Sequence, residues 1–423
     1  MFPPSPLRWL YVDFNSYFAS VEQQLQPHLR NKPVIVIPVD TESTCAIAAS
    51  YEAKAFGIKT GTPVWEAKQK CRDLICVLAR HDAYVDYHHR AIAEIERHIP
   101  VAAVCSIDEM AAQLLRNEAG EEAAKRIALS IKAGLCDSLG PWVRCSIGIA
   151  ANRYLAKVAT DIEKPDGLTV LMPDQVEHRL MALNPRDLPG IGANMERRLR
   201  AAGVVSMVDL WALDAKSMAR IWGGIVGERL WYLLRGHDLP ELETSRRTIG
   251  HSHVLGPDLR PAHKAIDVAR RLTLKACSRM RRMGYHAAEF SFSARMEDGV
   301  RIHAQQKCRP AQDSMTFLAM LLNFWERLIP KKPGTLVKKI SVVLHGLVAD
   351  DAIQPDLFDA VGHRTTAGNA VDRNIRLSCA LDRINTRFGR DSALIGMLPS
   401  QGRSFSGTKI AFTRIPDREE FFE

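Results

Sequence analysis

The spacing of apolar residues divides the chain into three parts. Up to about residue 172, short apolar runs such as 9–13 and 34–38 alternate with stretches in which apolar residues recur every three or four positions, as in helices. From 173 to 236 the spacing is helical throughout, whereas 246–350 follows the order strand, helix, strand, strand, helix, strand. The pattern therefore predicts an α/β or α+β core, a helical middle domain and a βαββαβ unit.

Composition and charge narrow the class of protein. The length of 423 residues suggests about three domains, and 46% hydrophobic with 25% charged residues excludes a disordered chain, a collagen or a transmembrane bundle. The net charge is +9, and 246–350 alone carries nineteen Lys and Arg against eight Asp and Glu, a net +11. Because this basic excess lies in one unit, it favours duplex DNA over a membrane surface as the partner.

Cysteine usage and the first residues indicate a cytoplasmic protein. The nine cysteines are scattered and include no C-x-x-C pair, which is typical of free thiols in a reducing compartment. Residues 1–14 lack the apolar core of a signal peptide, and no apolar run is long enough to cross a membrane. We therefore expect a cytoplasmic protein that does not associate with membranes.

Two apolar runs end in acidic residues. Asp13 closes the run at 9–13, and Asp108 with Glu109 closes the run at 101–109. Single acids at strand ends are common turn residues, but two such strands can bring their carboxylates to one point. Converging carboxylates repel one another unless a cation lies among them, and their oxygens suit Mg²⁺ or Mn²⁺. A pair of such ions promotes in-line displacement at phosphorus.

Six motifs follow one another in the first half of the chain. They are V-D-F-N-S-Y-F-A-S-V-E-Q (12–23), A-A-S-Y-E-A-K-A-F-G-I-K-T-G (48–61), S-I-D-E (106–109), S-I-G-I-A-A-N-R-Y-L-A-K-V-A-T-D (146–161), K-P-D-G (164–167) and L-P-G-I-G (188–192). In this order and spacing they resemble the Y family of translesion DNA polymerases, and the resemblance extends over about residues 8–350. It implies a right-hand polymerase of low fidelity that adds deoxynucleotides to a primer 3′ end under template direction, in DNA repair and the SOS response.

The resemblance also implies a domain order and a set of partners. We expect a monomer that binds primer–template DNA, deoxynucleoside triphosphates and the sliding clamp. The domains would be an α+β palm (1–27 and 79–172), small fingers (28–78), a helical helix-hairpin-helix thumb (173–236), a linker (237–245), a βαββαβ little finger (246–350) and a tail (351–423).

The catalytic residues can be placed by the same resemblance. Asp13 and Asp108 would bind two Mg²⁺ ions, for which Mn²⁺ could substitute, and Glu109 would complete the site for the attacking 3′-oxygen. The carbonyl of Phe14 would add a ligand. Phe18 matches the aromatic steric gate that excludes ribonucleotides, although its spacing alone would equally suit a core residue on a helix face.

Nucleotide contacts follow from the second and fifth motifs. Tyr51, Lys54 and Lys164 fall where the family contacts the triphosphate, and Tyr17, beside the gate, is also expected to bind the nucleotide. Two cations and a phenol would balance the charge that develops in phosphoryl transfer. Many members carry Arg in place of Lys54, and Lys cannot make the planar bidentate contact of Arg.

Further segments suggest how DNA and the clamp are held. In L-P-G-I-G, Gly190 and Gly192 would let backbone N–H groups approach a phosphate, although a plain turn between helices explains the pentapeptide equally well. The peptide Q-P-D-L-F resembles a clamp-docking motif, in which Gln354, Leu357 and Phe358 would be the anchors. A run of cations without intervening acids predicts backbone binding by a helix; it comprises Arg270, Arg271, Lys275, Arg279, Arg281 and Arg282.

Some residues depart from the family pattern. Asn15 replaces an acid that some members carry, and Ala111 with Ala112 follows Glu109 where many members have a Tyr and an apolar–acidic pair, which would leave a smaller wall beside the sugar. An inactive adaptor that links clamp, DNA and another polymerase is therefore an alternative. A metal-dependent nuclease is another, because it would use the same acids, but it would not explain Phe18, Tyr51 or Lys164. The intact acids favour an active polymerase. Residues 381–396 loosely resemble the tail of mutagenesis-associated members and have no assigned role.

Overall fold

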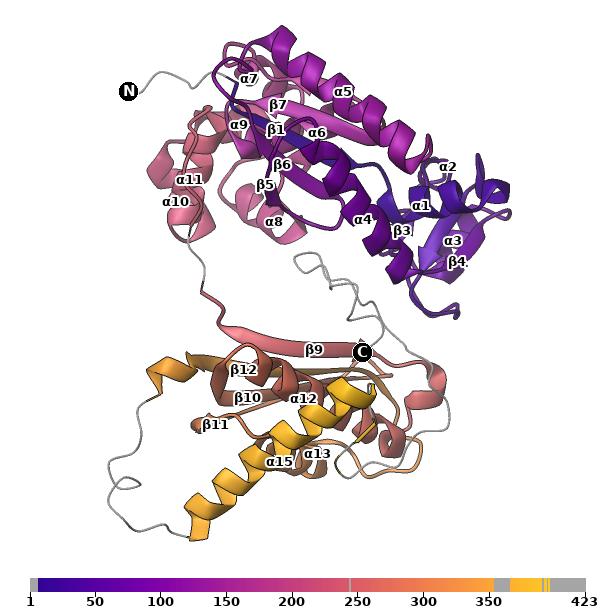
Figure 1. Cartoon of the computed structure of the whole chain (residues 1–423), viewed down its shortest axis with the longest axis vertical. Coiled ribbons are helices and arrows are strands. Elements are labelled where there is room, and N and C mark those ends of the chain that lie inside the picture. Colours follow the sequence, from indigo (N-terminus) through magenta and orange to yellow (C-terminus); the bar gives the residue numbers. More distant parts are fainter. Residues whose placement is uncertain (1–6, 243–244, 354–365, 390–391, 394, 396–423) are drawn as a thin grey trace. The chain divides into compact units, whose positions relative to one another are not determined.

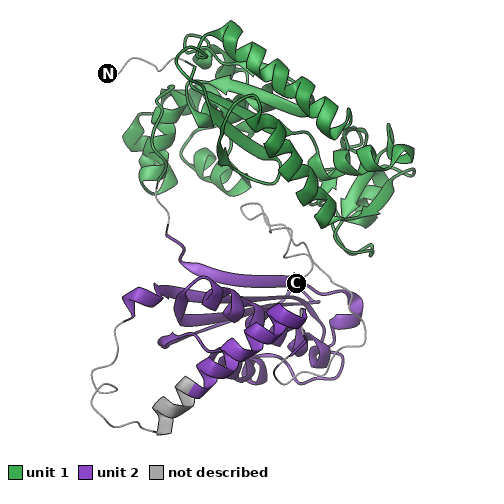
Figure 2. Cartoon of the chain, viewed as in Figure 1, with its two compact units in different colours: residues 1–242, 408–418 green, residues 243–407, 419–423 purple. Residues whose placement is uncertain are grey.

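The structure is a computed structural model that describes residues 7–242, 245–353, 366–389, 392–393 and 395, with the backbone alone for 366–372. The chain folds as two compact units (Figure 2). The main described part of the first unit ends at residue 242, and that of the second begins at residue 245. Among the described residues, no helix is both long enough and apolar enough to cross a membrane.

A five-stranded sheet forms the centre of the first unit (Figure 1). Its middle strand is β1, in which every residue after Trp9 is buried, and β1 pairs antiparallel with β6 on one side and β7 on the other. The strand order is β5 (Val101–Val104), β6 (Glu109–Gln113), β1 (Trp9–Phe14), β7 (Cys145–Ala150) and β8 (Leu168–Val170).

Helices cover this sheet and connect its strands. The change from a continuous apolar run at 9–13 to helical spacing predicts a sharp junction, and β1 does pass directly into α1 through Ser16, whose φ is 50°. The helix α6 packs on β1 and β7, while α4 and α5 pack against each other. These helices are α1 (Tyr17–Leu25), α4 (His81–Glu96), α5 (Glu121–Leu139) and α6 (Arg153–Ile162), and the short η1 (Pro27–Leu29) follows α1.

A smaller sheet has its own apolar core. Ile35, Ile37, Ala53, Ile58 and Val64 pack together between its strands and helices. The apolar run at 45–49 suggests a strand of five residues, but only its last two residues pair along a strand, and Cys45 makes a single bridge to Pro63. The elements are β2 (Val34–Ile37), β3 (Ala48–Ala49), α2 (Tyr51–Lys54), α3 (Val64–Lys70) and β4 (Ile75–Leu78).

The remainder of the first unit is helical, as its apolar spacing predicts. Its core, which includes Leu199, Leu210, Met218 and Leu234, is continuous with residues of α6 such as Leu155. The elements are α7 (Val176–Met181), η2 (Pro185–Asp187), α8 (Ala193–Ala201), α9 (Met207–Ala212), α10 (Ala215–Trp222) and α11 (Ile225–Leu234).

The second unit is a four-stranded antiparallel sheet with helices on one face (Figure 1). Phe290 and Phe292 of the sheet are fully buried against helical residues such as Phe317. The order confirms the predicted βαββαβ arrangement. The elements are β9 (Thr248–Val254), η3 (Pro257–Leu259), α12 (Ala262–Arg282), β10 (Tyr285–Met296), β11 (Arg301–Ala311), α13 (Ser314–Leu328), β12 (Val337–Ala349) and η4 (Asp350–Ala352).

A last helix, α15 (Thr366–Phe388), packs on α13. The carboxylate of Asp382 accepts two hydrogen bonds from the guanidinium of Arg281, at 2.7 and 3.0 Å, and Ser378 Oγ accepts one from Ser314 N. Residues 381–388, for which the sequence suggested no role, therefore belong to the helical layer of the second unit.

Candidate active site and nucleic-acid interface

Three carboxylates lie close together where β1 ends and β6 begins. Asp13 is directly opposite Glu109 in the antiparallel ladder, and Phe14 N donates to Asp108 O at 2.9 Å. The sequence interpretation of 101–109 as one buried strand was wrong, because β5 ends at Val104 and Glu109 begins β6. Asp108 thus lies in the turn between two strands, and the turn brings it to the acids of the ladder.

Two lysines lie among the acids. Lys157 Nζ contacts Asp13 and lies 2.9 Å from Glu109 Oε1, and Lys164 Nζ lies 2.7 Å from both Asp13 Oδ2 and Asp161 Oδ1. Although burial opposes the charged form, Asp13 and its neighbours raise the pKa of both lysines. Lys157 was not predicted from the sequence, although its spacing of four residues from Asp161 on a helix was visible there.

The charge of the site still favours a further cation. Burial raises the pKa of Asp108 to about 6, and the neighbouring Asp13 and Glu109 add to this, whereas a hydrogen bond from Ser106 Oγ opposes it. No group of three or more acidic, His or Cys side chains in the described part of the chain forms a ready metal cage. The oxygens nevertheless fit a hard divalent cation, provided that they turn from the lysines toward it.

Phe18 is half-buried and stacks on Tyr84, with ring centroids 4.4 Å apart. The Tyr84 hydroxyl donates to Glu22 Oε1 at 2.8 Å, and Arg80 donates to both oxygens of the same carboxylate. Tyr17 differs from its prediction, because its side chain is buried and its hydroxyl donates to the Tyr84 carbonyl at 2.7 Å. The Tyr17 ring therefore belongs to the core and offers no side-chain contact to a nucleotide.

The three residues expected to contact the triphosphate lie close together. Lys54 Nζ is 4.3 Å from the centre of the Tyr51 ring. Burial lowers the pKa of Lys54, and the nearby Lys164 lowers it further. Asn15 fixes the loop that carries Lys164, because its Oδ1 accepts a hydrogen bond from Asp166 N at 2.7 Å. The structure thus gives Asn15, which departs from some family members, a role in holding this loop.

The two alanines after Glu109 face opposite sides of the sheet. Ala111 is opposite Tyr11 and shares the face of the acids, whereas Ala112 pairs with Leu10 and points to the other side. The Tyr11 hydroxyl donates to Glu109 Oε2 at 3.1 Å. The expectation that both alanines shorten the wall is therefore corrected, since only Ala111 lies on that face and Tyr11 packs beside it.

The L-P-G-I-G segment connects η2 to α8. Gly190 has a φ of 89°, a conformation that favours glycine, and no atom of the described residues lies within 4 Å of where a Cβ would stand at Gly190 or Gly192. The turn is open enough for a phosphate to approach the start of α8. The Tyr154 hydroxyl supports the turn by donating to Pro189 O at 3.0 Å.

The second unit offers two basic surfaces. On α12, Arg281 is occupied by Asp382, and Arg270 lies 3.0 Å from Asp267. The other surface, which was not predicted from the sequence, is the face of the sheet opposite the helices. Alternation along β10 signals it, because Phe290 and Phe292 point inward, whereas Ser291 between them and Ser293 after them lie on the opposite face. Its polar and basic residues include Ser252, Ser293, Arg295, Arg301, His303, Lys307, Lys339 and Ser341.

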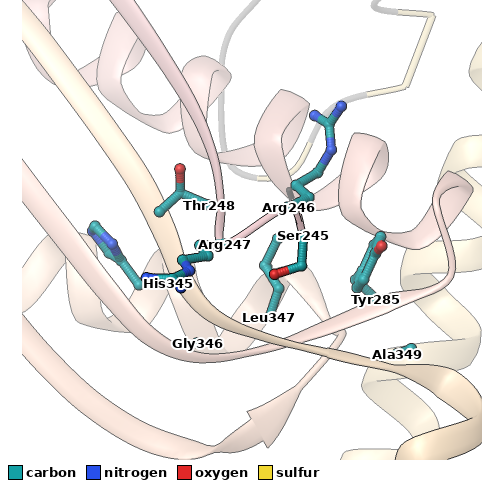
Figure 3. A pocket seen from close by; sticks show the side chains of 9 residues that line it. All are labelled: Ser245, Arg246, Arg247, Thr248, Tyr285, His345, Gly346, Leu347 and Ala349. Carbon is teal, nitrogen blue, oxygen red and sulfur yellow. The ribbon is translucent and has the colours of Figure 1, made fainter. Parts of the chain in front are cut away.

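A cavity of about 590 Å³ lies in the second unit, where β9 begins and β12 ends (Figure 3). Arg246, Arg247, Tyr285 and His345 are among its lining residues, and His345 Nε2 lies 2.8 Å from Ser291 Oγ. No carboxylate of the described residues lines it. The predicted clamp anchors Gln354, Leu357 and Phe358 lie outside the part of the chain that the structure describes.

Models of known protein families match three stretches of the chain. Residues 12–161 match the impB/mucB/samB family, and 246–357 match the C-terminal domain of the same family. Residues 186–238 match the thumb domain of DNA polymerase-iota.

Similar proteins cover nearly the whole chain. DNA polymerase IV of Pelotomaculum thermopropionicum is 32% identical over 394 residues, which are 91% of this chain and 94% of that protein. DNA polymerase IV of Moorella thermoacetica is 30% identical, over 90% of this chain and 93% of that protein. Among solved structures, the Y-family DNA polymerase chimera Dbh-Dpo4(243-245)-Dbh has a TM-score of 0.67 at 24% identity, over 81% of this chain and 99% of the chimera.

Proposed function

Because the chain belongs to the impB/mucB/samB family, the Y family of DNA polymerases, we propose that Asp13, Asp108 and Glu109 form its polymerisation site. The chain is a DNA-directed DNA polymerase of the translesion type. The observation that carries the assignment is the ladder pairing of Asp13 with Glu109, with Asp108 in the adjoining turn. No other acidic cluster in the described residues combines a buried strand pair with two lysine contacts.

For this polymerase we propose the domain order that the sequence predicts. The five-stranded sheet with α1 and α4 to α6 would be the palm, and the three-stranded sheet the fingers. The helices α7 to α11 would be the thumb, and the βαββαβ unit the little finger. The proposed limits are 1–27 and 79–172 for the palm, 28–78 for the fingers, 173–236 for the thumb, 237–245 for the linker, 246–350 for the little finger and 351–423 for the tail.

The acids would hold two Mg²⁺ ions, with Mn²⁺ as a substitute. Asp13, Asp108, Glu109 and the carbonyl of Phe14 are the proposed ligands, all of them hard oxygen donors. Bound divalent ions supply activation of the 3′-oxygen and stabilisation of the leaving pyrophosphate. Lys157, which now neutralises Asp13 and Glu109, would release those oxygens when the ions bind.

Three residues would bind the incoming nucleotide through its phosphates. Lys164 and Lys54 supply positive charge, and the Tyr51 hydroxyl supplies a hydrogen-bond donor, since burial raises its pKa and keeps it protonated. Lys54 would contact a phosphate through its ammonium group alone, whereas an Arg would donate two parallel hydrogen bonds. The ring of Phe18, fixed from behind by Tyr84, would close on the sugar and exclude a 2′-hydroxyl.

Primer–template DNA would be held by the backbone of the thumb turn and by the little finger. For the little finger we propose the open face of the sheet. Its short serines let a duplex backbone approach, and Arg295 of β10, Arg301 and Lys307 of β11 and Lys339 of β12 supply cations. The cations of α12 remain the competing surface. Gln354, Leu357 and Phe358 would dock the monomeric enzyme on a sliding clamp.

Primer extension with Mg²⁺ tests the acidic site. The double variant Asp108→Ala/Glu109→Ala should lose extension on the order of 1,000-fold or more, since it removes ligands and charge at the reacting atoms. The control Glu121→Ala/Glu122→Ala removes two acids from the first turn of α5 and should extend normally. Equal extension by the acidic-site variant and the wild type would remove the assignment. Shortened primers from the wild type would indicate a nuclease, and no extension by the wild type an adaptor.

A further inference from the structure

Tyr11 lies on the catalytic face of β1, two residues before Asp13. Its Oη donates to Glu109 Oε2 at 3.1 Å, whereas Glu109 Oε1 lies 2.9 Å from Lys157 Nζ. The two oxygens of Glu109 therefore have different partners. The Lys157 ammonium also lies 5.7 Å from the centre of the Tyr11 ring, so that the phenol and the lysine hold the carboxylate between them.

The ring of Tyr11 is fixed by its packing. Tyr11 is 5% exposed and packs in a cluster with Leu155 and Ala159 of α6. Its direct ladder partner is Ala111, whose methyl group leaves room for the ring on this face. A ring held in this way directs its hydroxyl along one line.

The proton stays on the Tyr11 hydroxyl under ordinary conditions. A phenol ordinarily titrates at about pH 10 and is therefore protonated at neutral pH. The phenol is thus a permanent donor, whereas Lys157 is a cation that a divalent ion would replace.

We infer that Tyr11 is a positioning residue for Glu109, which keeps Oε2 in place while Oε1 passes from Lys157 to a divalent cation. The inference rests on the proposed function of the acids. Outer partners of metal-binding carboxylates set their orientation and raise metal affinity. Tyr11 on β1 therefore orients Glu109, which the methyl side chain of Ala111 on β6 could not do.

The test measures Mn²⁺ binding by electron paramagnetic resonance. The protein is bound to primer–template DNA that ends in a dideoxynucleotide, with the next deoxynucleoside triphosphate, so that no turnover occurs. Tyr11→Phe keeps the ring and removes the hydroxyl, and we expect its Mn²⁺ dissociation constant to rise about tenfold. Thr273→Val is the matched control, because it removes a fully buried hydroxyl of the second unit that donates at a similar distance, 2.9 Å, to the carbonyl of Ala269.

A double-mutant cycle separates positioning from a general loss of stability. In a Glu109→Ala background, Tyr11→Phe should leave the Mn²⁺ dissociation constant unchanged. An equal loss in both backgrounds, or wild-type Mn²⁺ binding by Tyr11→Phe, would overturn the inference. A Glu109→Ala variant that binds Mn²⁺ like the wild type would instead overturn the proposed role of the acids.

Discussion

The ring of Phe18 lies against the ring of Tyr84, with 17° between the two planes and 4.4 Å between the centroids. The rings come from α1 and α4, and Tyr84 cannot easily move, because its hydroxyl is bound to the fully buried Glu22, which Arg80 also holds. A rigid aromatic support behind Phe18 is what a steric gate needs, because a ring that could retreat would admit a larger sugar.

The first prediction concerns sugar selection. Phe18→Ala should raise the insertion of a ribonucleotide relative to the deoxynucleotide on the order of 100-fold, because the wall against the 2′-hydroxyl is removed. Single-nucleotide insertion with ATP and dATP opposite a template T measures the ratio. Leu129→Ala, which removes an exposed apolar side chain from α5, serves as the control. If the ratio does not change, Phe18 is a core residue and not the gate.

The second prediction concerns acid sensitivity. His88 is buried, and its Nδ1 lies 2.7 Å from the carbonyl of Ile107, next to Asp108. Burial lowers the pKa of His88 to about 4, although the carbonyl opposes this. Between pH 6.5 and 4 the unfolded chain therefore binds a proton at His88 that the folded chain does not, so stability falls as the pH falls through this window.

Urea unfolding at pH 7 and at pH 5 measures this effect. Between pH 7 and pH 5 His88 should lower the free energy of unfolding by about 1–2 kcal/mol, whereas protonation of Asp108, whose pKa burial raises to about 6, works in the opposite direction. His88→Gln keeps a donor for the carbonyl and removes the titration, so its loss between the two pH values should be smaller. His89→Gln, whose parent side chain is exposed, is the control. Identical losses in His88→Gln and the wild type would contradict the prediction.

Local patterns were sufficient for most elements but not for the turn that carries Asp108. The β1 to α1 junction could be predicted because the apolar period changes abruptly after Asp13. In contrast, 101–109 has no Gly or Pro to mark a turn, so it was interpreted as one strand, whereas β5 ends at Val104 and β6 begins at Glu109. The chain reverses there because Cys105 N bonds back to Glu109 O, a contact that periodicity does not reveal.

Other residues of the site were not predicted from the sequence because they reach it through long-range contacts. Lys157 is far from Asp13 in sequence, and only the packing of α6 on β1 places its ammonium between Asp13 and Glu109. Tyr11 could be assigned to a buried strand, but its hydroxyl bond to Glu109 depends on the ladder register. Pattern alone therefore located the acids, and tertiary structure was needed for the groups that hold them.

The third prediction separates the two basic surfaces of the second unit. Arg295 and Lys339 are exposed ladder partners on the open face of the sheet. Arg295→Ala/Lys339→Ala should weaken DNA binding and lower the slope of log affinity against log salt by about 2, because two phosphate contacts are lost. Arg279→Ala/Arg282→Ala on α12 should change this slope less. Fluorescence anisotropy over a salt series measures the affinity and its salt slope. A larger effect of the α12 variant would show that DNA binds to this helix and not to the open face of the sheet.

The last prediction concerns the close approach of α6 to the sheet. Gly148 of β7 is the ladder partner of Tyr11, and a Cβ at this position would stand 2.1 Å from Ala156 O and 2.7 Å from Thr160 N. Gly148→Ala should therefore push α6 outward and lower the free energy of unfolding by about 1–3 kcal/mol, as overpacking does. Since α6 carries Lys157, primer extension should fall in conditions where the variant is still folded.

Gly120→Ala is the matched control, because no atom of the described chain lies within 4 Å of where its Cβ would stand and its φ of −80° suits any residue. Its unfolding free energy should stay within about 0.5 kcal/mol of the wild type. Urea melts and extension assays on both variants decide the matter. A Gly148→Ala protein with wild-type stability and extension would show that α6 can shift without disturbing the acids, and that Lys157 need not lie at its observed distance from Glu109.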